Sequence, residues 1–357
     1  MPLTLDHLAR LATIGWRADF TLPTDKLDSS ILARVIIQHR NGYVVHDGTH
    51  EFIVQPAPHF LKRTLDPVDR PAVGDFVLLQ AGKPPHIETI VERHSTLRRA
   101  AAGERYRRQL IATNIDNVLV LMGLDGDFNP RRLERYFALI EASGARSVVV
   151  LTKADHHEDL DAVMADVADV LPGHTPIHPV NSKDPDSLRV LHQYLGPGST
   201  SVLVGSSGVG KSTLTNTLLG IERMATKPVR ENDSRGRHTT TFRALINLPQ
   251  GGCLIDTPGM RELKLTGEEE FVDGQFADID ALAADCRFGD CAHQSEPGCA
   301  VRSAREDGSL DPDRWASYEK LRSERDAQAA QLEVQLKRQA SQRGHKKPSN
   351  QRPRDRG

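Results

Sequence analysis

The feature that most constrains this 357-residue chain is a glycine-rich segment in its second half. The segment reads GSSGVGKST over residues 205–213 and fits the pattern G-x-x-x-x-G-K-[ST]. An apolar run, SVLVG (201–205), precedes it, and we expect a helix to begin near Lys211. In a strand–loop–helix unit of this kind, backbone N–H groups surround phosphates at the positive end of the helix. The segment therefore predicts a phosphate loop that binds a nucleoside triphosphate.

The residues of this phosphate loop have separate expected roles. Lys211 is expected to reach the β- and γ-phosphates, and Ser212 is expected to coordinate Mg²⁺. The other loop residues are expected to bind the nucleotide around them: Gly205, Ser206, Ser207, Gly208, Val209, Gly210 and Thr213.

Two short motifs follow the phosphate loop. At DTPG (256–259), Asp256 ends an apolar run and is expected to hold Mg²⁺, while the N–H of Gly259 is expected to meet the γ-phosphate. Between the two lies GRHTTT (236–241), where Thr239 or Thr240 would complete the Mg²⁺ shell and sense the γ-phosphate. The order and spacing of the set support a nucleotide-dependent switch.

The base is indicated by TKAD (152–155), which follows the apolar run SVVVL (147–151). It resembles the N-K-x-D guanine motif, in which the Asp accepts two hydrogen bonds from guanine; adenine would leave that carboxylate poorly paired. Thr152 stands where Asn is usual, and VNSK (180–183) follows the next strand, where GTPases often have S-A-K. The alternative is a helix-capping Asp after a core strand. We expect GTP to be bound through Thr152, Lys153, Ala154, Asp155 and Ser182.

The order of these motifs is unusual for a GTPase. The guanine motif at residue 152 precedes the phosphate loop at residue 205, and the DTPG motif comes last. One parallel sheet can be threaded in either order if its original termini lie close together and are joined. The sequence therefore predicts a circularly permuted GTPase domain, in which the second switch leads directly into the next domain.

The remaining pattern divides the chain into further units. Short β segments broken by Gly, Pro and Asp over residues 31–97 predict a small barrel, preceded by a short amphipathic helix. Apolar strands alternating with helices, expected at about 130–143 and 157–171, predict a parallel sheet with helices on both faces. A last helix is expected at about 312–340, followed by a disordered basic tail.

Three of the four cysteines lie close together around one histidine. The spacing C-x₄-C-x-H-x₅-C predicts a closed tetrahedral zinc site of structural type. The alternative is free thiols beside a surface histidine. Cys253 lies apart, in an apolar strand, and is expected to be buried without chemistry. The predicted zinc ligands are Cys286, Cys291, His293 and Cys299.

Charge and hydropathy limit the partners and the location. The formal net charge is only −2, but residues 93–108 hold six Arg against one Glu, and residues 336–357 hold eight Lys or Arg against one Asp. This asymmetry suits a polyanionic partner; a solvated surface and tail is the alternative. Neither an export signal nor a membrane-spanning run is evident, so a cytoplasmic protein is expected. The sequence carries no signal for oligomeric state, and a monomer is expected for the free protein.

With these motifs together, the chain resembles the ribosome small-subunit-dependent GTPases, the bacterial circularly permuted family called RsgA or YjeQ. The resemblance rests on residues 205–213, 236–241 and 256–262 and on the cysteine–histidine cluster, and it runs from about residue 31 to 320. It implies an OB-fold barrel (1–100), a permuted GTPase domain (101–268) and a zinc-binding helical domain (269–340) before the tail (341–357). It also implies binding to the small ribosomal subunit and its rRNA, with GTP hydrolysis stimulated by that subunit during its late maturation.

Hydrolysis requires an attacking water to be oriented at the γ-phosphate. The residue after DTPG, where many GTPases have Gln, is Met260, so slow intrinsic turnover is expected, with His238 as the candidate that orients the water. His238 could instead be a surface residue that contacts RNA. Two other functions compete: a nucleotide-gated RNA-binding module, and an ATP-dependent zinc metallochaperone or nucleic-acid-remodelling enzyme. Asp155 argues against ATP, and the four-ligand zinc pattern argues against metal delivery.

Overall fold

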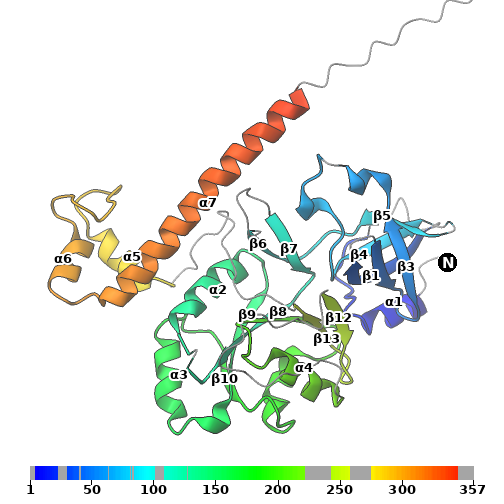
Figure 1. Ribbon diagram of the computed structural model, residues 1–357, viewed down its shortest axis with the longest axis horizontal. Helices are drawn as coiled ribbons and strands as arrows, with labels where there is room; N and C mark the ends of the chain where they lie inside the picture. The colour runs from blue at the N-terminus through cyan, green and yellow to red at the C-terminus, as the bar shows by residue number, and fades with distance from the viewer. Residues whose placement is uncertain are drawn as a thin grey trace, which may run out of the picture.

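The computed structural model describes residues 5–22, 30–39, 42–62, 64–80, 82, 84–100, 108–126, 128–221, 243–257 and 275–344. These form a β-barrel, a parallel sheet covered by helices, and a C-terminal group of helices (Figure 1). No helix in these ranges is both long and apolar enough to span a bilayer. The predicted site residues His238, Thr239, Thr240 and Gly259, together with Met260, lie outside the described residues.

The N-terminal unit is a five-stranded closed barrel of OB type. Its strands pair in the order β1-β2-β3-β5-β4, and β4 pairs back with β1. Only the β3–β5 pair is parallel. This closure removes exposed sheet edges and confirms the predicted barrel. The elements of this unit are α1 (Leu5–Ala12), β1 (Ser30–His39), β2 (Gly42–His46), β3 (Glu51–Pro56), η2 (Pro58–Leu61), η3 (Pro67–Asp69), β4 (Phe76–Gln80) and β5 (His86–Ile90).

The amphipathic helix α1 covers one side of the barrel. Leu11 on the helix and Ile14 just after it are fully buried. Trp16 then packs edge-on against Phe76 of β4, with ring centroids 4.9 Å apart. An edge-to-face pair of this kind adds to the gain from burial alone, so the N-terminal segment is an integral part of the barrel.

The central unit contributes six strands, in the order β10-β9-β8-β11-β13-β12, to a continuous 11-stranded sheet in which β12 also pairs with β1 of the barrel. All neighbouring pairs are parallel except β12–β13. The predicted strands and helices are present, with ends that differ by a few residues. The strands are β8 (Asn117–Gly123), β9 (Arg146–Thr152), β10 (Ile177–Val180), β11 (Thr200–Gly205), β12 (Ala244–Asn247) and β13 (Cys253–Asp256), and the helices are α2 (Arg131–Glu141), η4 (Ala154–His156), α3 (Leu160–Ala168), η5 (Ser187–Tyr194) and α4 (Lys211–Leu219).

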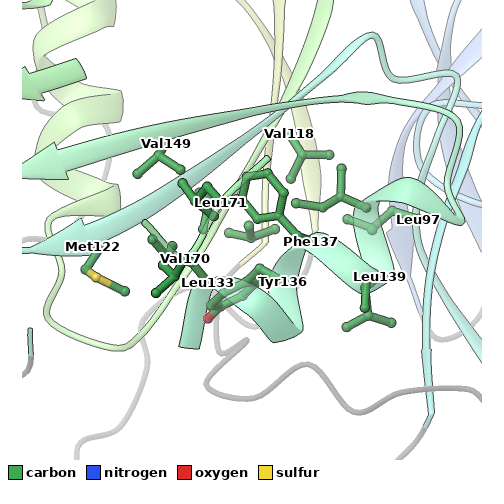
Figure 2. Close-up of a cluster of buried hydrophobic side chains, with 14 of the residues drawn as sticks. Leu97, Val118, Met122, Leu133, Tyr136, Phe137, Leu139, Val149, Val170 and Leu171 are labelled. Atoms are coloured by element: carbon green, nitrogen blue, oxygen red, sulfur yellow. The ribbon is translucent and has the colours of Figure 1, made fainter. Parts of the chain in front are cut away.

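Helices cover both faces of this sheet, as predicted. On one face, Leu133 and Phe137 of α2 pack with Val118 of β8 and Val149 of β9 (Figure 2). On the other face, the intervening residue Leu119 packs with residues of η5 and α4. Side chains of a strand point alternately to opposite faces, so a strand buried on both sides must be apolar throughout. That requirement explains the unbroken apolar runs in the sequence.

The remaining elements flank the central sheet. A two-stranded hairpin lies between the barrel and the sheet, and the C-terminal helices follow the last strand. The final helix runs to Gly344, four residues beyond its predicted end, because its sequence contains neither Pro nor Gly between Asp313 and Arg343. Its C-terminal end projects away from the sheet (Figure 1). The elements are β6 (Thr96–Ala100), β7 (Arg108–Thr113), α5 (Ala277–Ala284), α6 (Ala300–Glu306) and α7 (Pro312–Gly344).

A fully buried arginine joins the barrel to the central sheet. Arg34 of β1 donates hydrogen bonds to the carbonyl oxygens of Ile14 (2.5 Å), Gly74 (3.1 Å) and Asn114 (2.9 Å), and to Thr200 Oγ1 of β11 (2.9 Å). Burial lowers the pKa of this guanidinium, partly offset by nearby acidic groups and Cys253. Because a buried charge is costly unless its hydrogen bonds are satisfied, these acceptors fix the two units at one relative position.

The C-terminal helices are held to the central unit by a second buried charge. Glu134 of α2 is fully buried and accepts hydrogen bonds from Arg314 Nη1 of α7 (2.5 Å) and from Ser317. Arg314 also pairs with Asp278 of α5 (3.0 Å) and donates to the carbonyl oxygen of Gln275 (2.5 Å). A fully bonded network of this kind specifies one docking geometry.

We predict that Arg34→Met lowers the free energy of unfolding by at least about 3 kcal/mol, because several buried acceptors lose their donor. Urea denaturation of the purified protein would measure the change. The matched control is Arg17→Met at the same junction. Arg17 pairs with Asp19 and Asp116 but is 37% exposed, so its loss should cost less than about 1 kcal/mol. Equal stability of Arg34→Met and the wild type would contradict the prediction.

Candidate functional site

The predicted phosphate loop begins at the carboxyl end of β11 and leads into α4. Gly205 has φ +146°, and a Cβ atom there would lie 2.4 Å from the Leu121 carbonyl oxygen of β8. Gly210 immediately precedes α4 with φ +100°. Both positions therefore need glycine. The loop presents its backbone at the N-terminus of α4, where a helix favours anions.

Lys211 lies inside this loop. Its Nζ donates to the carbonyl oxygens of Gly205 (2.7 Å) and Ser206 (2.6 Å). Burial lowers the pKa of Lys211 to about 8, and the nearby carboxylate of Asp256 partly opposes this shift. A phosphate bound beside the ammonium would favour its charged form and raise that pKa again.

Asp256 ends β13, the strand next to β11. It is 4% exposed, and burial raises its pKa while Lys211 lowers it. The hydroxyl of Thr257 donates to the carbonyl oxygen of Leu203 in β11 (2.8 Å), which fixes the end of β13 against the base of the phosphate loop. Ser212 is the second residue of α4. The donor set at this edge, a buried carboxylate and a hydroxyl, is of the kind that Mg²⁺ prefers.

The predicted guanine motif lies at the carboxyl end of β9, next to the phosphate loop. Thr152 is fully buried, and its hydroxyl donates to the carbonyl oxygen of Val209 in the loop (2.7 Å). Thr152 therefore links the two motifs directly, although it stands where Asn is usual. The hydroxyl has only one hydrogen to donate, and it is directed to the loop.

The other residues of the guanine motif are arranged around the following turn. Lys153 has φ +61°, and its ammonium contacts the carboxylate of Asp125. The carboxylate of Asp155 is 37% exposed and lies 3.5 Å from His156 Nε2. The cap of α3 is supplied by Asp159, which accepts a hydrogen bond from Ala162 N (3.0 Å). Asp159, and not Asp155, is therefore the cap of α3. This weakens the alternative interpretation in which Asp155 only caps a helix and does not bind guanine.

Ser182, after β10, completes this side of the site. It is 7% exposed, and its Oγ lies 3.3 Å from where a Cβ of Gly210 would be. Its carbonyl oxygen accepts from Thr217 Oγ1 of α4 (2.7 Å). Among the described residues, its buried hydroxyl has no hydrogen-bond partner. The sheet thus brings the two guanine-type loops, the phosphate loop and Asp256 to one edge, where ligands bind in open α/β sheets.

Sequence reasoning missed one residue at this edge. Arg132, in the first turn of α2, donates from Nη1 to Ser206 Oγ in the phosphate loop (3.1 Å). A signal was available, because α2 follows β8, and a helix that follows the strand beside β11 begins near the phosphate loop.

The predicted metal ligands form a separate cluster between α5 and α6. The ligand atoms of Cys286, Cys291, His293 and Cys299 all lie within 4.8 Å of one another. His293 Nδ1 is 3.6 Å from Cys286 Sγ and 3.5 Å from Cys299 Sγ, and these two sulfurs are 3.9 Å apart. Around tetrahedral zinc, the corresponding separations are roughly 3.6 Å between N and S and 3.8 Å between two S atoms. The cluster therefore fits one zinc ion.

The ionisation of the cluster also suits a cation. Burial opposes ionisation of Cys286, but the backbone N–H groups of Val301 and Ala300 outweigh it, and the pKa of its thiol is lowered. Burial and the neighbouring cysteines raise the pKa of Cys291 to about 11. Adjacent thiolates repel one another, so a cation is needed to hold all three deprotonated.

Glu296 shapes the turn that carries His293. Its carboxylate accepts hydrogen bonds from the backbone N–H of Ala292 (2.9 Å), Gln294 (2.9 Å) and Ser295 (3.0 Å). Backbone hydrogen bonds, including that of its own N–H, lower the pKa of Glu296 to about 2. This support holds His293 at φ +64°, a conformation that non-glycine residues seldom adopt.

Comparison with known proteins agrees with this geometry. A family model described as RsgA GTPase matches residues 90–266. The protein "Small ribosomal subunit biogenesis GTPase RsgA" of Xanthomonas axonopodis pv. citri (strain 306) is 51% identical over 340 residues, which cover 95% of this chain and 91% of the relative. This chain belongs to the RsgA GTPase family. The protein of the same description from Xanthomonas euvesicatoria pv. vesicatoria (strain 85-10) is 50% identical over equal shares.

Two solved structures share the fold. The crystal structure of YjeQ from Thermotoga maritima has a TM-score of 0.57 at 24% identity and covers 82% of this chain and 97% of its own. The structure of YloQ, described as a circularly permuted GTPase, has a TM-score of 0.56 at 25% identity and covers 86% and 98%. The predicted family and permuted architecture are thus confirmed. The roles of single residues within the RsgA family site stay predictions.

We predict that Thr152→Val weakens GTP binding roughly five- to ten-fold, because the Val209 carbonyl oxygen loses a buried donor of about 1 kcal/mol. Fluorescent GTP titration would measure the affinity, and Thr152→Asn should retain it. The matched control is Thr113→Val, which removes a buried hydroxyl that donates to the Val73 carbonyl oxygen (3.3 Å) away from the site. Wild-type affinity in Thr152→Val would contradict the assigned link.

Proposed function

We propose that this protein binds the small ribosomal subunit and hydrolyses GTP, in a manner stimulated by that subunit, during late subunit maturation. The observation that carries the proposal is the near-full-length identity to relatives described as small ribosomal subunit biogenesis GTPases. The convergence of guanine-type loops, phosphate loop and Asp256 at one sheet edge supports GTP as the substrate. The protein would work where ribosomal subunits are assembled, in the cytoplasm, and as a monomer when free.

The nucleotide is proposed to bind across this edge. Asp155 would accept hydrogen bonds from guanine, and the stem of Lys153 would pack against the ring. The phosphate loop would surround the phosphates, with Lys211 at the β- and γ-phosphates. Ser212 and Asp256, with a threonine of the first switch, would hold Mg²⁺, which supplies neutralisation of the charge that develops on the phosphates.

Hydrolysis itself needs a group that orients water. Met260 cannot accept or donate the required hydrogen bond, so we propose His238 for this role, acting as a neutral imidazole that accepts from the water. Both residues lie outside the described part of the chain. Slow turnover without the ribosomal subunit follows if that subunit is what brings His238 to the nucleotide.

Binding to rRNA is supported by the barrel. OB-type barrels bind oligonucleotides and folded RNA. Of the predicted basic segment, Arg93 pairs with Asp75 and Arg108 with Asp66, so these two serve the fold. Arg243, just before β12, is partly buried and donates from Nη1 to the carbonyl oxygen of Leu110 in β7 (2.5 Å), so it serves the fold as well.

The cysteine–histidine cluster is proposed to hold one structural zinc ion. Its four ligands close the tetrahedron, which leaves no position for a substrate. Helix α5, which precedes the cluster, is bound to α2 through Arg314 of α7, which pairs with both Asp278 and Glu134. Zinc would therefore stabilise the surface that docks on the GTPase domain.

The deciding experiment measures GTP hydrolysis by the purified protein alone, with small ribosomal subunits and with large subunits. We expect small subunits to accelerate turnover by roughly ten-fold or more, as an activating partner does for other slow GTPases. His238→Ala should lose this acceleration and keep its GTP affinity. Equal slow turnover in all three mixtures, despite tight GTP binding, would favour a nucleotide-gated RNA-binding module instead.

A second prediction concerns the metal. The purified protein should release about one zinc ion per chain when its thiols are modified, as measured with a zinc-binding dye. Cys299→Ser should release much less and melt at a lower temperature, because zinc binding stabilises the folded domain. The control is Cys253→Ala, which removes a buried cysteine of β13 outside the cluster and should keep its zinc. Zinc-free wild-type protein that binds none after refolding would refute the assignment.

A further inference from the structure

The phosphate loop receives a second positive charge from an element outside the nucleotide motifs. Arg132 of α2 donates from Nη1 to Ser206 Oγ (3.1 Å), and Lys211 Nζ donates to the carbonyl oxygen of the same residue (2.6 Å). Ser206 is therefore contacted by an ammonium group at its backbone and by a guanidinium group at its side chain. Two cations converge on one residue of a loop that is built to surround phosphates.

The contact follows from the strand order. Strand β8 pairs in parallel with β11 in the register Val120 with Val204 and Leu121 with Gly205. Strand β8 runs two residues beyond the partner of Gly205, so both strands end at the same edge of the sheet, and the helix after β8 begins beside the loop after β11. Arg132 lies in the first turn of that helix, so the fold delivers its side chain to the loop over a short distance.

Arg132 differs from its neighbours on the same helix. Arg131 pairs with Glu134 and Asp311 (3.2 and 2.8 Å), and Arg135 pairs with Glu324 (2.7 Å). Both of these contacts connect α2 within itself or to the C-terminal helices. Arg132 contacts the phosphate loop through Ser206 Oγ, a contact that ties α2 to the nucleotide edge of the sheet.

We propose that Arg132 is an arginine supplied in cis that binds the terminal phosphate of GTP. This inference rests on the proposed nucleotide site and adds to it a catalytic residue from α2. The γ-phosphate carries the charge that distinguishes GTP from GDP and that grows during hydrolysis. The guanidinium remains charged throughout the physiological pH range and offers several donors in one plane, which suits phosphoryl oxygens.

The proposal predicts a selective loss for Arg132→Gln. Affinity for a non-hydrolysable GTP analogue should fall about ten-fold or more, the usual effect of losing a hydrogen bond to a charged group, whereas GDP affinity should change less than about two-fold. Single-turnover hydrolysis without ribosomes should slow as well, and Arg132→Lys should restore part of both. Binding titrations and rapid-quench assays measure these quantities on the full-length protein.

Two controls separate this role from others. Arg131→Gln removes the adjacent positive charge, and it should leave the ratio of analogue to GDP affinity unchanged. Equal losses of analogue and GDP affinity in Arg132→Gln would overturn the proposal and make Arg132 a positioning residue for the loop. Wild-type affinities and rates would overturn it too. Because no assay contains ribosomal subunits, a failure of the ribosome-stimulated function would not affect these outcomes.

Discussion

The parallel pairing of β11 between β8 and β13 is the constraint on which the rest of the structure depends. Because neighbouring parallel strands end at the same edge, the loop after each one opens beside the loops of its neighbours. That edge gathers the phosphate loop, Asp256 and the start of α2. Chain order is irrelevant to this geometry, and so a permuted sequence can build the same site as an unpermuted one.

Permutation does change what the site is connected to. Thr257, just after β13, is held at the nucleotide edge by its hydrogen bond to the Leu203 carbonyl oxygen. Gln275, just before α5, is held by Arg314 at its carbonyl oxygen and donates from its side chain to the carbonyl oxygen of Glu134 (2.6 Å). On the other side, Arg34 fixes the barrel to Thr200 at the beginning of β11. The central unit is therefore hydrogen-bonded to the barrel on one side and to the C-terminal helices on the other.

Much of this could be predicted from the sequence, because the signals are local. Unbroken apolar runs reveal strands buried on both faces, glycine spacing reveals the phosphate loop, and cysteine spacing reveals the metal cluster. The contacts of Arg34, Glu134 and Arg132 could not be predicted in the same way. Arg34 sits in an apolar strand, where it looks like a solvent-facing residue, and its acceptors lie 20 to 166 positions away in the chain. Such pairings exist only after the units have docked.

The cap of α3 and the arginines of residues 93–108 likewise depend on tertiary contacts that the sequence pattern does not reveal. Asp159 rather than Asp155 caps α3, although both residues are aspartates and residue type alone does not distinguish them. The excess of arginine over residues 93–108 suits a polyanionic partner or a solvated surface, yet Arg93 and Arg108 pair with the carboxylates of Asp75 and Asp66. Residue type shows that a side chain can cap a helix or form an ion pair. The tertiary contacts determine which residues of that type do so.

The strand order also has a consequence for how the chain is made. Strands β8, β9 and β10 are consecutive in sequence and adjacent in the sheet, with α2 and α3 between them, so they form a self-contained unit. During synthesis, at about 5–20 residues per second, this unit emerges before β11 and β13 exist. The unit of β8, β9 and β10, which carries TKAD and NSK, can therefore fold first. Strand β11 then pairs with the exposed edge of β8.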